Sequence, residues 1–261
     1  YTAPPGGLHV RLGDLPSPEI ETRLHHKLDA VQAFMRANPI DRHIYDTQDA
    51  SFGIVTTGKG HLDTMEALRL LGLDEAACRR LGIYKIGMVW PLALDDALDF
   101  VKGKREVLVI EEKRGIIESQ FKEAFYDWPG SKPARMVGKH DENLEELVPW
   151  TGELSPLKLL PIIAARLSAF FPEENLLEKA RALTDQPSVL LNVPGATRTP
   201  YFCSGCPHNS STKLPEGSKA NSGIGCHVMA SWMDRETAGF AQMGGEGVPW
   251  IATSMFNGGK H

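Results

Sequence analysis

Three cysteines in the last quarter of the chain have the spacing of a metal site. Cys203 and Cys206 form a C-x2-C pair, and Cys226 follows after a further 19 residues. A C-x2-C pair can bind one metal centre from a single turn, and a third cysteine on a second loop makes a chance arrangement less common. The residues allow an iron–sulfur cluster, a zinc site completed by His208 or His227, or free structural thiols. The spacing favours the iron–sulfur cluster, with one ligand still to be identified.

Glycines lie beside these cysteines. Gly205 separates the first two thiols, and Cys226 ends the segment SGIGC (222–226). Glycine permits tight turns in which amide hydrogens point at sulfur, and such contacts stabilise thiolates. The fourth cysteine, Cys78, lies in a predicted helix far from the others, and we interpret it as a small, semi-buried apolar residue.

Two further segments have residue types that could bind a ligand. Residues 56–60 (TTGKG) join a predicted strand to a predicted helix, where amide hydrogens and Lys59 could bind a phosphate. Residues 111–114 (EEKR) end a predicted strand at the edge where open α/β sheets bind ligands. We favour structural interpretations: a tight turn requires glycine for geometry alone, and a charge run at a strand end is commonly solvated or ion-paired.

Predicted strands and helices alternate through the middle of the chain. The strand patterns cover residues 51–57, 84–90, 106–112 and 133–139, and the helical patterns cover 61–73, 94–103 and 115–127. This alternation implies parallel strands joined by right-handed crossovers. We therefore predict an α/β domain over residues 48–150, with an open, mainly parallel sheet and helices on both faces.

The flanking segments differ from this domain. Residues 1–47 combine a linker rich in Pro and Gly with one amphipathic helix that begins near Ser17. Residues 151–185 contain two predicted helices, which we expect to connect two domains. Residues 186–261 carry the three clustered cysteines and have few apolar runs. We expect this last segment to be less ordered in isolation, because it offers little apolar area to offset chain entropy.

The composition excludes several classes of protein. A hydrophobic content of 42% is that of a globular chain, and 28 basic against 33 acidic residues give a charge of −5. We therefore expect neither nucleic acid nor a membrane as a partner. The chain lacks a membrane-length apolar run and a signal-peptide pattern, and its clustered cysteines suit a reducing compartment, so we expect a cytoplasmic protein. We also expect a homo-oligomer and, since the sequence has no initiator Met, a segment of a longer polypeptide.

The cysteine segment resembles the thiamine diphosphate-binding part of the 2-oxoacid:ferredoxin oxidoreductases, most closely the indolepyruvate ferredoxin oxidoreductases. The motifs that carry the resemblance are CSGCPH (203–208), NSGIGCH (221–227) and MGGEGVPW (243–250). Upstream, FGIVTTGKG (52–60), YKIGMVWPL (84–92) and VLVIEEKRGIIESQ (107–120) are similar to the transketolase C-terminal-like domain of that family. The resemblance implies that residues 48–150 form this domain and that residues 186–261 begin a thiamine diphosphate-binding domain.

The resemblance also implies site residues and cofactors. Cys203, Cys206 and Cys226 would bind a [4Fe–4S] cluster, and His208 would lie near thiamine diphosphate. The family's Gly-Asp-Gly magnesium motif and its fourth cysteine do not occur in this sequence. We therefore expect thiamine diphosphate and magnesium to be bound largely by residues outside this segment, and the segment alone to be inactive.

The implied reaction is the CoA-dependent oxidative decarboxylation of an aryl 2-oxoacid such as indolepyruvate. Coenzyme A would take the acyl group and ferredoxin the electrons, in an assembly completed by the rest of the polypeptide or by a partner subunit. Two other functions stay open on the residues alone. One is a thiamine-dependent decarboxylase or transketolase relative without a cluster, against which the three thiols argue. The other is a zinc-stabilised interaction module, which metal analysis would distinguish.

Overall fold

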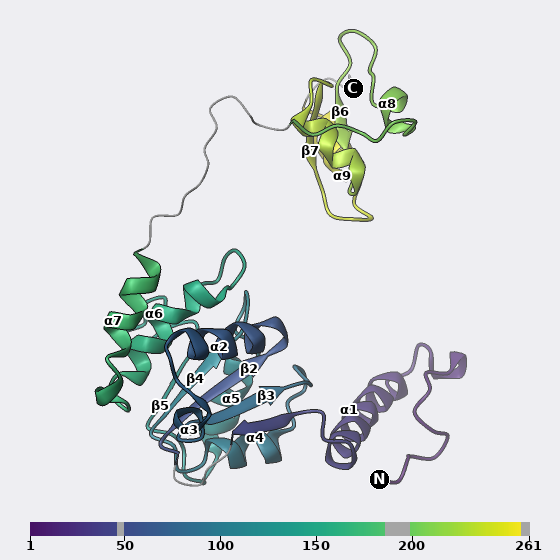
Figure 1. Ribbon diagram of the computed structural model, residues 1–261. Helices are drawn as coiled ribbons and strands as arrows, with labels where there is room; N and C mark the ends of the chain where they lie inside the picture. Colours follow the sequence, from purple (N-terminus) through teal and green to yellow (C-terminus); the bar gives the residue numbers. More distant parts are fainter. Residues whose placement is uncertain (46–49, 186–198, 257–261) are drawn as a thin grey trace. The chain divides into compact units, whose positions relative to one another are not determined.

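The computed structural model describes residues 1–45, 50–185 and 199–256 of the 261-residue chain. The chain forms two compact units, residues 1–187 and residues 188–261 (Figure 1). Among the described helices, none has the length and apolar character needed to cross a lipid bilayer.

A five-stranded sheet forms the centre of the first unit, with strand order β1-β3-β2-β4-β5 (Figure 1). The strands are β1 (Arg42–Tyr45), β2 (Phe52–Thr57), β3 (Gly82–Ile86), β4 (Glu106–Ile110) and β5 (Arg135–Val137). β2 pairs in parallel with β3 and β4, and β4 pairs in parallel with β5. The predicted mainly parallel sheet is thus confirmed. The edge strand β1, antiparallel to β3, was not predicted, because its four residues are only partly buried and show no strand alternation.

Helices cover both faces of this sheet, as predicted. Neighbouring residues of a strand point to opposite faces, and accordingly Ile54 and Val55 of β2 belong to two separate apolar clusters. The Ile54 cluster includes side chains of α2 (Gly58–Leu70), α3 (Glu75–Cys78), α6 (Pro156–Leu167) and α7 (Leu176–Thr184). The Val55 cluster includes side chains of α4 (Leu94–Val101) and α5 (Ile116–Asp127). Cys78 lies in the first cluster and is 4% exposed, so it is an apolar residue as expected, but it is buried in the core and not semi-buried.

The two helices expected to connect domains form a layer of the first unit. α6 begins at Pro156, with the Ser155 side chain accepting the Lys158 N–H, and it contacts both α2 and α7. Arg166 of α6 donates to the carboxylate of Glu106 in β4 at 2.6 Å. A short 3-10 turn, η2 (Pro172–Glu174), precedes α7. The sequence predicted these two helices but not the surface that buries them.

The helix α1 (Glu19–Ala37) begins close to its predicted start. The Ser17 hydroxyl accepts the N–H of Glu19 at 3.2 Å, although the N-cap position itself is Pro18. Further along the helix, the Gln32 side chain donates to the carbonyl oxygen of Leu92 at 2.7 Å. This contact ties α1 to the loop that follows β3.

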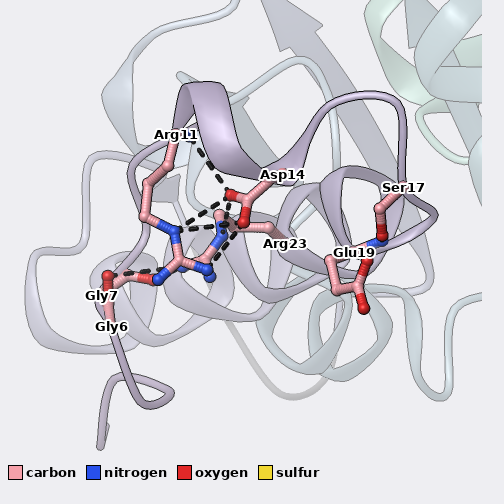
Figure 2. Close-up of polar contacts among 7 residues, drawn as sticks. All are labelled: Gly6, Gly7, Arg11, Asp14, Ser17, Glu19 and Arg23. Carbon is pink, nitrogen blue, oxygen red and sulfur yellow. Dashed lines mark hydrogen bonds and ion pairs between the residues drawn. The ribbon is translucent and has the colours of Figure 1, made fainter.

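The residues before α1 are anchored by one buried carboxylate. Asp14, at the end of the 3-10 turn η1 (Leu12–Asp14), accepts hydrogen bonds from Arg11 at 2.7 Å and from Arg23 of α1 at 3.1 Å (Figure 2). Arg23 also donates to the carbonyl oxygens of Gly6 and Gly7. The hydrogen bond from Arg11 holds the pKa of Asp14 below its usual value. The segment expected to be a linker is therefore held to α1 by a specific polar cluster.

A buried histidine gives the first unit a predictable response to acid. His61 of α2 is 8% exposed, and its Nδ1 lies 3.0 Å from the Thr56 hydroxyl. Burial, followed by the charge of Lys85, lowers the pKa of His61. The unfolded chain therefore binds the proton more readily, and this contribution to stability is present above about pH 6.5 and lost as pH falls below it.

We expect the free energy of unfolding to fall by up to about 1.4 kcal/mol per pH unit just below pH 6.5 because of His61. Urea denaturation at a series of pH values between 5 and 8 measures this slope. His61→Asn should flatten it, since an amide oxygen can still bind the Thr56 hydroxyl but does not titrate. His25→Asn, at an exposed position, is the matched control for the substitution itself. Equal slopes in the wild type and His61→Asn would contradict the prediction.

Candidate metal centre and the loops around it

The acidic residue that follows β4 is part of the scaffold. Glu111 is 4% exposed, and its carboxylate accepts the N–H groups of Ile116, Ile117 and Glu118 at 2.9–3.0 Å. These are first-turn amides of α5, which have no acceptor within the helix. Burial raises the pKa of Glu111, and the three hydrogen bonds act in the opposite direction. The expectation of a solvated or ion-paired side chain is wrong for Glu111, which caps a helix from a buried position.

The charged residues around Glu111 bind the loop 149–154. The carboxylate of Glu112 accepts the Leu154 N–H at 2.8 Å, and Lys59 donates to the Leu154 carbonyl and to Asp63, each at 2.7 Å. The buried Lys139 donates to the Pro149 carbonyl at 3.1 Å. The Lys59 ammonium is therefore engaged within the protein and is not presented to a phosphate.

The glycine turn after β2 has the structural role that we favoured. Gly58 has a φ of +51°, a conformation that glycine adopts without strain. This geometry turns the chain from the end of β2 directly into α2, which begins at Gly58.

The second unit contains the predicted metal ligands. Its elements are α8 (His208–Ser211), β6 (Ala220–Ser222), the 3-10 helix η3 (Cys226–Trp232), β7 (Thr237–Phe240) and α9 (Val248–Ser254). β6 and β7 form a two-stranded parallel sheet. Cys203 and Cys206 lie on the loop that leads into α8, and Cys226 is the first residue of η3. Each cysteine group thus lies at the entrance to a short helix.

Both cysteine loops turn at glycines, as predicted. The Cys206 N–H donates to the Cys203 carbonyl at 3.0 Å, and the Asn209 amide donates to the same carbonyl at 2.9 Å. Gly205 has a φ of +78° and Gly225 has a φ of +101°, which are values that side chains other than glycine rarely allow. The sequence of these loops therefore specifies their backbone geometry.

Two histidines join the cysteine loops. The rings of His208 and His227 stack with their centroids 5.6 Å apart and their planes 24° apart. His208 also contacts the ring of Phe202 at 5.2 Å, and Nδ1 of His227 accepts the Gly223 N–H at 2.7 Å. The predicted cofactor neighbour His208 and the loop of Cys226 thus lie side by side. Sequence reasoning had considered His227 only as a possible zinc ligand.

The third motif of the segment lies beside the same loop. A Cβ built on Gly223 would lie 3.7 Å from Cγ of Glu246, within the glycine-rich stretch before α9. The carboxylate of Glu246 accepts the Gly244 N–H at 2.8 Å. All three sequence motifs in this unit therefore contribute to one group of loops.

The three thiols are not gathered into one coordination shell. Within the described ranges, no three His, Cys, Asp or Glu residues are placed so that they could hold a metal ion. Cys203 and Cys226 are exposed, Cys206 is half-buried, and all three are free of disulfides. The donor chemistry still fits a thiolate-bound centre, because accessible thiols on turns with amide hydrogens are the ligands that zinc and iron–sulfur clusters use.

Comparison with known proteins gives a family match for the first unit. The model of the indolepyruvate oxidoreductase domain family matches residues 42–188. The protein "Indolepyruvate oxidoreductase subunit IorA" of Thermococcus kodakarensis is 29% identical over 187 residues, which are 70% of this chain and 26% of that protein. The protein of the same name in Methanothermobacter thermautotrophicus is 26% identical over 206 residues, 75% of this chain and 28% of the relative. The chain therefore spans about a quarter of the length of these relatives.

A solved structure is also similar over part of the chain. It is a 2-oxoglutarate:ferredoxin oxidoreductase from Magnetococcus marinus with 2-oxoglutarate, coenzyme A and succinyl-CoA bound. The similarity covers 61% of this chain and 24% of that chain, with 14% sequence identity and a TM-score of 0.38. At this score the similarity carries no conclusion about the fold or the site.

Proposed function

We propose that this chain, which belongs to the indolepyruvate oxidoreductase domain family, is part of a subunit of a 2-oxoacid:ferredoxin oxidoreductase. The family match covers the sheet of the first unit together with α6 and α7. Because the chain spans about a quarter of its relatives, the complete reaction requires residues from outside it. We assign the first unit as the transketolase C-terminal-like domain and the second unit as the start of the thiamine diphosphate-binding domain.

The proposed cluster ligands are Cys203, Cys206 and Cys226. The observation that carries this assignment is the contact of the two cysteine loops through His208 and His227, with every thiol available. A [4Fe–4S] cluster bound there would supply single-electron transfer. The protein's own part is to hold both loops in tight turns, and a fourth ligand would come from elsewhere in the assembly.

The proposed reaction is the CoA-dependent oxidative decarboxylation of an aryl 2-oxoacid with ferredoxin as acceptor. His208 would lie beside thiamine diphosphate, and the diphosphate and its magnesium would be held largely by residues beyond this segment. The His208 side chain is already oriented by two ring contacts, with Phe202 and His227. This orientation supports a role in contacting a bound cofactor.

The surface of the second unit supports association with more protein. Large apolar side chains on and around β7 and α9 are exposed, among them Trp232, Phe240, Ile251, Met255 and Phe256. Within the described range 199–256, the buried apolar residues of this unit are Phe202 and Ala230. A unit with this ratio of exposed to buried apolar side chains gains stability when another surface covers it. We propose that the rest of the polypeptide or a partner subunit supplies that surface.

The function is tested by an assay of the complete enzyme with its partner subunits. Reduction of ferredoxin should depend on both an aryl 2-oxoacid and coenzyme A, and indolepyruvate should be used in preference to 2-oxoglutarate. A preference for 2-oxoglutarate would correct the proposed substrate class. The absence of ferredoxin reduction with every 2-oxoacid tested would contradict the proposed function.

A further inference from the structure

We propose that His227 is a positioning residue that locks the loop of Cys226 and holds it against the loop of Cys206, and that it is not a metal ligand. His227 makes two contacts that support this role, a hydrogen bond with Gly223 and a ring contact with His208. Its consequence for a cluster rests on the proposed function. His227 directly follows Cys226 in the chain, but its role differs from that of the neighbouring thiols, which we assign as metal ligands.

The first step concerns the proton of the His227 ring. Nδ1 accepts the N–H of Gly223 at 2.7 Å, so this nitrogen carries no proton and its lone pair is occupied. A neutral imidazole then has its proton on Nε2. Neither nitrogen offers a free lone pair to a metal while this hydrogen bond is present. His227 is therefore unsuited to be the fourth ligand of a zinc site.

The second step concerns the backbone on each side of the thiol. The hydrogen bond from Gly223 to His227 closes a loop of five residues that contains Cys226. Gly225 within the loop has a φ of +101°, a conformation that glycine adopts without strain and that turns the chain tightly before Cys226. Ser222, just before the loop, donates to the Gly239 carbonyl of β7 at 2.7 Å. The loop is thus fixed at its base and closed by His227.

The third step links this closed loop to the other two cysteines. The ring of His227 stacks on His208, which follows Cys206 by two residues, and His208 contacts Phe202, which directly precedes Cys203. A row of three rings therefore connects the flanks of all three cysteines. Holding ligand loops in place before binding reduces the entropy that ordering them would cost.

The two contacts of His227 can be removed separately. His227→Phe keeps an aromatic ring for the stack with His208 but removes the Nδ1 acceptor. His227→Asn keeps an oxygen acceptor near the position of Nδ1 but removes the ring. Ser210→Ala is the matched control, because it removes a side-chain hydrogen bond, from the Ser210 hydroxyl to the Pro207 carbonyl, in α8, which follows the other loop. The variants are made in the complete subunit.

Amide hydrogen exchange at Gly223, followed by mass spectrometry, measures the first contact. We expect exchange about tenfold faster in His227→Phe, and near the wild-type rate in His227→Asn and Ser210→Ala. Unchanged exchange in His227→Phe would overturn the proposal. If His227→Phe does not fold, His227→Asn decides: a Gly223 amide as protected as in the wild type supports the proposal, and a Gly223 amide that loses its protection in this variant contradicts it.

Iron and acid-labile sulfide measured in the same preparations test the consequence for the cluster. Both His227 variants should lose bound iron several-fold faster than the wild type under a chelator, whereas Ser210→Ala should retain it. Retention of iron at the wild-type rate in both variants would overturn the positioning role. A wild-type protein without iron would refute the proposed function, and the exchange at Gly223 would still decide whether His227 closes the loop.

Discussion

Replacing Glu111 with alanine is expected to lower the free energy of unfolding of the first unit by about 3–5 kcal/mol. Three amides of α5 would lose their only carboxylate acceptor, and each is in a buried or partly buried position. The change also affects the buried Lys139, whose ammonium donates to the Glu111 carbonyl. Burial lowers the pKa of Lys139, and the charge of Glu111 is the first influence that opposes this. Removing the carboxylate therefore leaves a buried cation with less compensation.

Urea denaturation, with exchange of the α5 amides as a local readout, measures this loss. Glu123→Ala is the matched control, because Glu123 lies on the same helix and is exposed. The control should change stability by less than about 0.5 kcal/mol. A loss below about 1 kcal/mol in Glu111→Ala would show that the carboxylate does not cap α5.

Replacing Cys206 with alanine in the complete enzyme is expected to remove the visible absorption of the cluster. Ferredoxin reduction should fall by at least about 100-fold at the same time, because a cluster that loses a thiolate ligand loses both affinity and a controlled potential. Cys206 is the half-buried member of the three thiols and follows the turn at Gly205. The measurement combines absorption spectra with anaerobic assays of ferredoxin reduction.

The chain contains its own control for this experiment. Cys78 is 4% exposed in the core of the first unit, and burial raises the pKa of its thiol. Cys78→Ala should reduce stability modestly and leave both the absorption and the ferredoxin reduction intact. If Cys206→Ala also kept both, the assignment of the cysteine ligands would be wrong.

The parallel sheet could be predicted because its strands are buried on both faces. β2 begins with the buried run FGIV and β4 contains the buried run VLVI, and the limits of both strands agree with the sequence patterns to within two residues. The third strand was placed too late: residues 84–90 were predicted, whereas β3 is Gly82–Ile86. The N–H groups of Gly87 and Met88 donate to the buried carboxylate of Asp41 at 2.6 and 3.0 Å, which ends the strand. An apolar run cannot reveal such an acceptor, because Asp41 is distant in sequence.

The sequence predicted which residues form the candidate site but not the contact between their loops. The spacing of the three cysteines and the adjacent glycines identified both loops, and the family match over residues 42–188 confirms the resemblance to indolepyruvate oxidoreductases. The stack of His208 on His227 depends on the folded path of the chain between the loops. Local sequence contains no signal for a ring contact of this kind, since neither histidine lies in a periodic element long enough to fix its direction.

The central claim, that the two cysteine loops bind one iron–sulfur cluster, is tested most directly by metal analysis of the complete subunit. The protein would be purified anaerobically, and iron, acid-labile sulfide and zinc would be quantified per polypeptide. The account predicts iron and sulfide in equal amounts, both lost together in the variants Cys203→Ala, Cys206→Ala and Cys226→Ala. Zinc without sulfide, or iron and sulfide that survive all three substitutions, would contradict it.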